Sequence, residues 1–164
     1  MLFRSEHNDV AGFVYAALGA AYAVILAFVA VAVWEEFKEA DQAVEAEASA
    51  LLMLYRSAAA FPVDVQDDIR ETSIRYGRTV ATQGWADLRS GRVSLAEQAA
   101  LDRLWQAHLN LNPSGDREST WLGQSLNALY RLTEQRAMRN YQAQNALPGA
   151  VWAVLIIGGL LTIR

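Results

Sequence analysis

Residues 10–34 read VAGFVYAALGAAYAVILAFVAVAVW and contain no Asp, Glu, Lys or Arg. About 20 apolar residues in a helix span the roughly 30 Å hydrocarbon core of a bilayer, so this stretch can cross a membrane with some tilt. A cleaved signal peptide is the alternative, but its apolar core has only about 7–15 residues. Residues 1–9 also carry Glu6 and Asp9 beside a single Arg4. The sequence therefore predicts a transmembrane helix at 10–34, preceded by an interfacial segment at 1–9.

A second apolar run occupies residues 147–164, opens with a Pro-Gly pair and closes with Arg164. Its length is at the low end of the range that spans a bilayer. Trp34 and Trp152 lie near the ends of the two runs, where amphipathic rings prefer the membrane surface. We expect a second transmembrane helix here, with a soluble insert at 35–146 between the two.

Small residues recur every three or four positions in the first run, which is the spacing of one helix face. They let helices approach closely in lipid, where packing replaces the hydrophobic effect. An Ala-rich chain can also produce such a face by chance. The same stripe continues beyond the apolar run, and predicts one helix of about 50 residues, or about 75 Å. The predicted packing face consists of Gly12, Ala16, Gly19, Ala23, Ala27 and Ala30, and its continuation of Trp34, Phe37, Ala40, Val44, Ala48, Leu51, Tyr55 and Ala58.

An acidic collar follows the first run, opposed only by Lys38; it comprises Glu35, Glu36, Glu39, Asp41, Glu45 and Glu47. If several copies surround an axis, rings of carboxylates favour cations. Charge runs are otherwise solvated helix faces. Asp41 borders the stripe, so it is the acid that we expect to face another helix. The candidate pore or interface acids are Glu35, Glu36, Asp41 and Glu45.

The insert reads as helices throughout, without the alternation that indicates strands. Pro62 should end the long helix and begin the next, while Gly84 and residues 89–92 should break that second helix. Ser94 and Glu97 have the spacing of a capping box. The predicted apolar faces are Val65, Ile69, Thr72, Tyr76 and Val80; Leu101, Leu104, Trp105, His108 and Leu109; and Leu122, Leu126, Leu129, Ala137 and Tyr141. The expected fold is all-α, with the first and last helices of the insert antiparallel.

Chemistry-bearing motifs are few. The triplet His7, Asn8 and Asp9 supplies ligand types for a metal or proton site, or a polar cap for the first helix. A metal site needs a further ligand, and His108 lies on an apolar face, where a hydrogen-bonded core histidine is expected. The chain has no Cys and a net charge of −4, which argues against a Cys-based zinc site and against nucleic acid as a partner. We predict no catalytic residues, no metal, no cofactor and no enzyme activity.

Several segments together resemble a bacterial membrane family described as bestrophin-like. They are residues 7–13 (HNDVAGF), 22–28 (YAVILAF), 34–37 (WEEF), 45–48 (EAEA), 54–56 (LYR), 100–105 (ALDRLW) and 147–162. The resemblance implies four membrane segments with the helical insert between the second and third, so this chain would hold the middle two, as a short member or a fragment. True bestrophins are oligomeric anion channels, whereas the acidic collar disfavours anions.

Two functions remain open. The first is a homo-oligomeric, channel-like membrane protein that conducts inorganic ions. The alternative is a membrane-anchored helical scaffold or sensor that binds a partner through its acidic insert. Arginine over lysine and abundant Ala indicate a bacterial origin, and hence the inner membrane. The positive charges of the insert alone favour a cytoplasmic insert; they are Lys38, Arg131, Arg136 and Arg139. Long inserts, however, translocate largely regardless of charge. The resemblance implies a basic cytoplasmic connection upstream, so we expect the insert outside.

Overall fold

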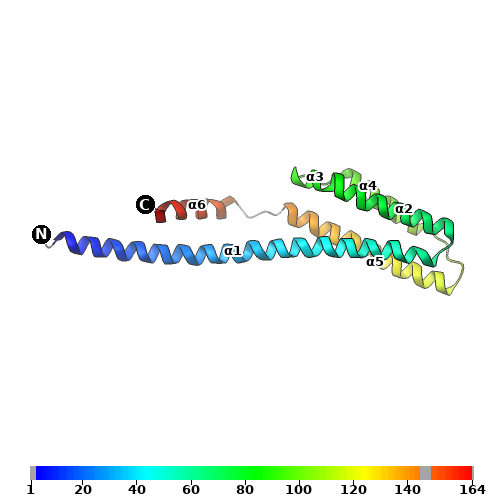
Figure 1. Ribbon diagram of the computed structural model, residues 1–164, viewed down its shortest axis with the longest axis horizontal. Helices are drawn as coiled ribbons and strands as arrows, with labels where there is room; N and C mark the ends of the chain where they lie inside the picture. The colour runs from blue at the N-terminus through cyan, green and yellow to red at the C-terminus, as the bar shows by residue number, and fades with distance from the viewer. Residues whose placement is uncertain (1–2, 145–148, 164) are drawn as a thin grey trace. The chain divides into compact units, whose positions relative to one another are not determined.

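The computed structural model describes residues 3–144 and 149–163, and within them it contains helices and no strand. The all-α prediction is confirmed. The elements in chain order are α1 (Phe3–Ser57), the 3-10 turn η1 (Ala58–Ala60), α2 (Val63–Thr79), the π-helical turn η2 (Val80–Gly84), α3 (Trp85–Arg89), α4 (Leu95–Leu109), α5 (Asp116–Gln144) and α6 (Gly149–Ile163) (Figure 1). The described residues form two compact units, 3–38 with 149–163 and 39–144.

The first unit holds the two apolar segments. By length and composition, α1 is the one described helix that could cross a membrane, and none of its most apolar stretch is buried within the chain. The apolar part of α6 is shorter, Val151–Leu161. Tyr22 joins the two helices, because its hydroxyl donates a hydrogen bond of 2.8 Å to the carbonyl oxygen of Leu155. A Cβ on Gly158 would lie 2.5 Å from the Tyr22 ring, so glycine permits this close approach.

The predicted packing face of α1 is left largely uncovered by the chain itself. Of its six residues only Gly19 is half-buried, and the others are exposed. The contact with α6 is made instead at Tyr22, beside that face. The face therefore stays a prediction for contact between chains.

The start of α1 corrects the capping hypothesis for the N-terminal triplet. The helix begins at Phe3, so His7, Asn8 and Asp9 lie within it and not at its cap. The side chains of these three residues lie outside the described part of the structure.

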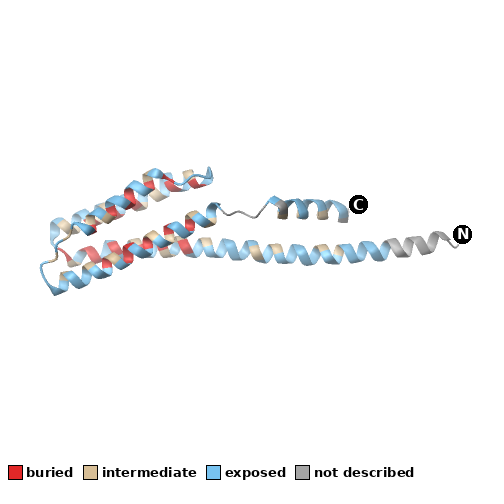
Figure 2. Ribbon diagram, turned by 180° about the vertical axis from the view of Figure 1, so that it is seen from behind, coloured by how far each residue is buried: buried red, intermediate tan, exposed pale blue. Residues whose placement is uncertain are grey.

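The second unit is an antiparallel four-helix bundle made by residues 39–57 of α1 with α2, α4 and α5. Gln142 donates a hydrogen bond of 2.8 Å to Glu39, and Ser125 donates one of 2.8 Å to Ser57. The start of the 39–57 part of α1 thus meets the end of α5, and the end of that part meets an earlier residue of α5, which confirms the predicted antiparallel pairing. Figure 2 shows the buried residues gathered along the facing sides of the bundle helices.

The apolar core of the bundle draws on all four helices. Of the predicted faces of α2 and α4, Ile69, Tyr76, Leu101 and Leu104 are at most 2% exposed, and others are half-buried against the core: Val65, Val80 and Trp105. A second, smaller cluster of Ala58, Phe61 and Ile69 closes the end near η1. The main cluster is Ala50, Leu54, Tyr76, Ala100, Leu101, Leu104, Ala128, Leu129 and Leu132.

Three predicted faces need correction. On α1 the buried positions are Ala43, Glu47, Ala50, Leu54 and Ser57, whereas Ala48 and Tyr55 of the predicted stripe are exposed. The predicted stripe lies to one side of the buried face of α1, because Ala and Glu occur both on the stripe and on the buried face. Leu109, Ala137 and Tyr141 are also exposed, since Leu109 ends its helix and the last turns of α5 bury arginines instead.

The predicted helix boundaries hold at Pro62 and Ser94 and fail at Gly84. Pro62 caps α2 with φ −54° and ψ 157°. The Ser94 side chain accepts a hydrogen bond from the Glu97 backbone N–H, which is one half of the predicted capping box; the Glu97 carboxylate accepts instead from Arg136 and Arg139. Gly84 does not break the second helix: the backbone continues from α2 through η2 into α3, which ends at Arg89, two residues before Gly91 with φ +72°.

Leu54 tests whether residues of α1 are part of the bundle core. Its side chain is fully buried in the main cluster. Leu54→Ala should lower the free energy of unfolding by about 2–5 kcal/mol, because it removes buried methyl groups and leaves a cavity. Urea unfolding of the full chain in detergent, followed by circular dichroism, measures this. Leu52→Ala, at a position 47% exposed, is the matched control and should change it by about 0.5 kcal/mol or less. Equal effects would contradict the assigned core.

Candidate functional site

Four ionised side chains lie in the core of the bundle, and we call them the buried ion cluster. Glu47 comes from α1, Glu97 from α4, and Arg136 and Arg139 from α5. Their side chains are between 2% and 9% exposed. Charged residues are almost never buried unless they are paired, so the geometry of the pairing decides what the cluster does.

Arg139 is at the centre of the buried ion cluster. Its Nε donates to Glu47 Oε2 at 2.7 Å, and its Nη2 donates to Glu97 Oε1 at 2.7 Å. Arg136 Nε donates to the same Glu97 oxygen at 2.5 Å, and Arg136 Nη1 donates to Gln98 Oε1 at 2.9 Å. One guanidinium therefore links α1 to α4, and the second fixes α4 against α5.

Tyr76 of α2 completes the ring of four helices around the cluster. Its hydroxyl donates a hydrogen bond of 2.6 Å to Glu47 Oε1. The pKa of Tyr76 is raised strongly, first by burial and then by the charge of Glu47 beside it. The phenol therefore keeps its proton, and acts as a permanent donor to the carboxylate.

The cluster contains two cations and two anions and is neutral overall. Burial acts to lower the pKa of Arg139, but its hydrogen bonds and ion pairs with Glu47 and Glu97 outweigh that effect and raise it. Arg139 therefore stays charged. Removing one partner of such a buried pair leaves an uncompensated charge in a medium of low dielectric constant, which is strongly destabilising.

The π-helical turn η2 is packed directly against the cluster. A Cβ placed on Gly84 would lie 2.3 Å from Glu97 Oε2, so only glycine allows the backbone to come this close. The next residue, Trp85, places its ring 5.6 Å from the guanidinium carbon of Arg139, a cation–π distance. Single π-turns inside α-helices are often found at functional sites, and here the turn brings both contacts to the ion cluster.

His108 of α4 is a core histidine, as expected from its position on an apolar face. It is 1% exposed, and its Nδ1 lies 2.8 Å from the Leu104 carbonyl oxygen. Burial lowers the pKa of His108, against an opposing effect from Asp68. The ring is therefore neutral, with Nδ1 donating to the carbonyl.

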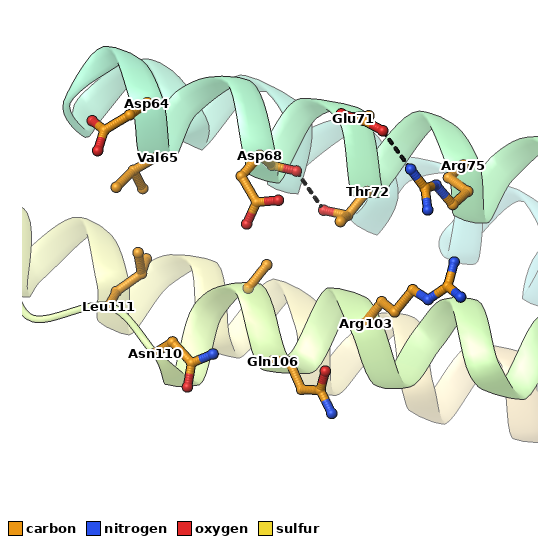
Figure 3. Close-up of a pocket in the computed structure, with 11 residues that line it drawn as sticks. Asp64, Val65, Asp68, Glu71, Thr72, Arg75, Arg103, Gln106, Asn110 and Leu111 are labelled. Atoms are coloured by element: carbon orange, nitrogen blue, oxygen red, sulfur yellow. Dashed lines mark hydrogen bonds and ion pairs between the residues drawn. The ribbon is translucent and has the colours of Figure 1, made fainter.

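A second polar feature is a groove between α2 and α4, with a volume of about 500 Å³. Figure 3 shows Asp64 and Asp68 along one side, with Arg75 and Arg103 near one end. Arg75 forms an ion pair with Glu71 on its own helix. The groove has mixed charge, because acids lie along α2 and the two arginines lie near one end.

The predicted candidate acids do not form a site within one chain. Glu35, Glu36, Asp41 and Glu45 are all exposed. The expectation that Asp41 faces another helix stays a prediction for contact between chains. Among the described residues, no group of three or more His, Asp or Glu is arranged to hold a metal ion.

Sequence reasoning missed the buried ion cluster. By sequence pattern alone, Glu47 belongs to the acidic collar, Glu97 to a capping box, and the two arginines to the charge balance across the membrane. A signal existed in α5, where Ser125, Leu129, Leu132, Arg136 and Arg139 follow one another at spacings of three and four. Two arginines that continue an apolar stripe indicate buried cations, and these need acids from neighbouring helices.

Comparison with known proteins gives one finding. A family model described as Bestrophin-like domain matches residues 1–164. No curated protein and no solved structure matches the chain significantly.

Glu97→Gln tests the energetics of the ion cluster. The substitution keeps the shape of the side chain and removes its charge, so both arginines lose their shared anion. The free energy of unfolding should fall by about 3–5 kcal/mol. The control is Glu71→Gln, whose exposed ion pair with Arg75 should contribute about 1 kcal/mol or less. Chemical unfolding of the full chain measures both, and equal small losses would show that the cluster is not desolvated.

His108 should make stability depend on pH. Because its folded pKa lies below the ordinary 6.5, the unfolded chain binds a proton before the folded chain does. Its contribution is present above pH 6.5 and is lost as the pH falls from that value through the lower folded pKa. The unfolding temperature should therefore drop as the pH falls below about 6.5, and His108→Gln should flatten that drop. An unchanged profile for His108→Gln would contradict the assignment.

Proposed function

Because the chain belongs to the Bestrophin-like domain family, we propose that it is a membrane-embedded homo-oligomer that conducts inorganic ions. The observation that carries the proposal is the uncovered apolar stretch of α1, followed within the same helix by exposed acids. Apolar surface of this extent is costly in water and favourable in lipid. The acids that follow it stand where the helix would leave the bilayer.

Support for two membrane spans comes from the first unit. Phe13, Leu18 and Phe28 of α1 are 58–76% exposed, as are Leu160 and Leu161 of α6 at 64–65%. The hydrogen bond from Tyr22 to Leu155 joins α1 and α6. Two adjacent spans place both ends of the insert on one side of the membrane. We assign the chain to the bacterial inner membrane, with the insert on the outer side.

Self-association is proposed through the face of small residues on α1. Gly12, Ala16, Ala23, Ala27 and Ala30 are exposed in the single chain, and their spacing suits close contact between helices in lipid. Copies arranged around an axis would bring Glu35, Glu36, Asp41 and Glu45 of each chain into rings. Rings of carboxylates select cations.

The test is conductance of the purified full-length oligomer in planar bilayers. The wild type should pass K⁺ in preference to Cl⁻. Neutralising the four acids (Glu35→Gln, Glu36→Gln, Asp41→Asn and Glu45→Gln) should lower that preference, because the rings lose their negative potential. The largest single effect is expected for Asp41→Asn.

The control replaces exposed acids of the insert, Asp67→Asn and Glu134→Gln, which should leave the ion selectivity unchanged. Absence of current in every salt from an oligomer shown to be incorporated would contradict the channel proposal. Reversal potentials that are the same for the collar variants and the wild type would contradict the role of the acids.

One observation favours the alternative, a scaffold or sensor anchored in the membrane. The groove between α2 and α4 is open, and it presents acids and arginines from two helices to solvent (Figure 3). Such a mixed-charge surface suits a polar partner with a complementary pattern. Under this alternative, Asp64→Arg with Asp68→Arg abolishes binding of the partner and leaves membrane insertion intact.

A further inference from the structure

A long groove runs along the bundle between α1 and α5, and we call it the α1–α5 groove. Two cavities of about 780 and 390 Å³ form it, and they merge because Met53, Gln124 and Ala128 line both. Met53, Trp121 and Tyr130 stand along the groove with 43–63% of their surface exposed. Aromatic residues and methionine are enriched where proteins contact one another, so this groove has the composition of an interface.

Unpaired arginines lie along the α1–α5 groove. Arg131 lines its larger cavity, Arg56 its smaller one, and Arg117 an adjoining recess of about 150 Å³ near η1. None of the three forms an ion pair within the described part of the chain. Among the described residues that line the groove, Glu134 is the one acid, and it follows these arginines along α5. From the η1 end onward, the charge is therefore first positive and then negative.

The groove between α2 and α4, called here the α2–α4 groove, has the opposite order of charges. Asp64 and Asp68 line it near the start of α2, and Arg75 and Arg103 lie near its other end (Figure 3). One groove is lined by α2 and α4 with the turn after α4, and the other by α1 and α5. They therefore lie on opposite sides of the core that the four helices share (Figure 1).

The charges of the two grooves match in level as well as in sign. Tyr76 is hydrogen-bonded to Glu47, so these residues mark one level on α2 and α1. At 1.5 Å per residue, Asp68 lies about 12 Å from that level and Arg56 about 14 Å, both toward the η1 end. Arg56 of one copy and Asp68 of the next are thus level when the two copies stand parallel.

A second pair of charges gives the same register. The indole N–H of Trp105 donates a hydrogen bond of 3.3 Å to Thr133, which sets the level of α4 against α5. Arg103 and Glu134 each lie within about 3 Å of that level along their helices. Parallel copies therefore bring Arg103 to Glu134. Antiparallel copies would instead place Arg103 near Arg56 and Asp68 near Glu134, and like charges that face each other disfavour that arrangement.

We propose that the α1–α5 groove of one copy receives the α2–α4 groove side of a second, parallel copy. This inference rests on the proposed homo-oligomer, in which the membrane gives all copies one orientation, and it assigns the contact outside the lipid. Because the two surfaces differ, the contact is heterologous, and its repetition around an axis perpendicular to the membrane builds a ring. The exposed Met53, Trp121 and Tyr130 supply apolar contact area, while the charge pairs fix the register.

Chemical cross-linking of the full-length chain in detergent tests the placement of the copies. The chain has no Cys, so introduced cysteines are its only thiols. Arg56→Cys with Asp68→Cys in one chain should give a ladder of dimers, trimers and larger species with a short bismaleimide, because each copy then carries one thiol on either side. Arg56→Cys or Asp68→Cys alone should give no cross-linked dimer.

The matched control is Arg56→Cys with Arg75→Cys. Position 75 lines the same groove as position 68 but lies about 10 Å further along α2. In the proposed register it faces the level of Glu134 and not that of Arg56, so this pair should lose the ladder.

Charge reversal tests the pairing without cysteines. Arg56→Asp and Asp68→Arg, each alone, should raise the protein concentration at half-association about fivefold, which corresponds to about 1 kcal/mol for an exposed ion pair. The two substitutions in one chain restore the pair with exchanged signs, and should return that concentration to within about twofold of the wild type. Light scattering of the full chain in detergent measures the association.

Several results would overturn the interface. A ladder from positions 56 and 75 in place of 56 and 68 would contradict the register, and dimers from Arg56→Cys alone would make the contact symmetric. Weaker association of Asp68→Arg that Arg56→Asp does not restore would assign the α2–α4 groove to another occupant. An oligomeric, conducting wild type without the 56–68 ladder would overturn this interface and leave the proposed channel intact, whereas a monomeric wild type would overturn both.

Discussion

The bundle depends on the burial of two arginines with two glutamates. A guanidinium cannot lose its proton in a protein, so Arg139 must be balanced wherever it is buried. Its two acids come from helices far apart in the sequence, with Glu47 separated from it by 92 positions. The relative registers of α1, α4 and α5 are therefore set by charge as well as by apolar packing. A shift of one helical turn would place a charge against leucines, at a cost greater than most packing errors. The neighbouring Gly84 and the π-turn follow from the same requirement, since the backbone must leave room for the Glu97 carboxylate.

α1 serves two environments with one backbone. Its first part is apolar on all sides, and the chain buries none of it; its last part has one buried face made of Ala43, Glu47, Ala50 and Leu54. The amphipathic pattern of the second part is weak, because alanine and glutamate alternate along it. The unit at 39–144 therefore includes residues of α1 in its own core.

The sequence was sufficient for the helical class, the antiparallel pairing of α1 with α5, the boundaries at Pro62 and Ser94, and the core positions of α2 and α4. All of these follow from spacing of apolar residues and from local backbone preferences. Two features could not be predicted from the sequence. Gly84 reads as a helix breaker, yet tertiary contact with Glu97 keeps the helix going as a π-turn. The ion cluster is not predicted because charged residues are expected at the protein surface unless their partners are known. A buried charge is recognised only together with its partners, and here they lie 39 to 92 positions apart.

The sharing of one Glu97 oxygen by two arginines has a consequence for how such a sequence can change over time. Replacing any one of the four ionised residues leaves at least one opposite charge without its partner, whereas replacing an acid together with an arginine keeps the cluster neutral. Drift at these positions should thus proceed in coordinated steps, with a neutralising substitution on α5 tolerated only alongside one on α1 or α4. In a deep mutational library of this chain, the four positions should behave as a single epistatic unit, intolerant one at a time and permissive in combination.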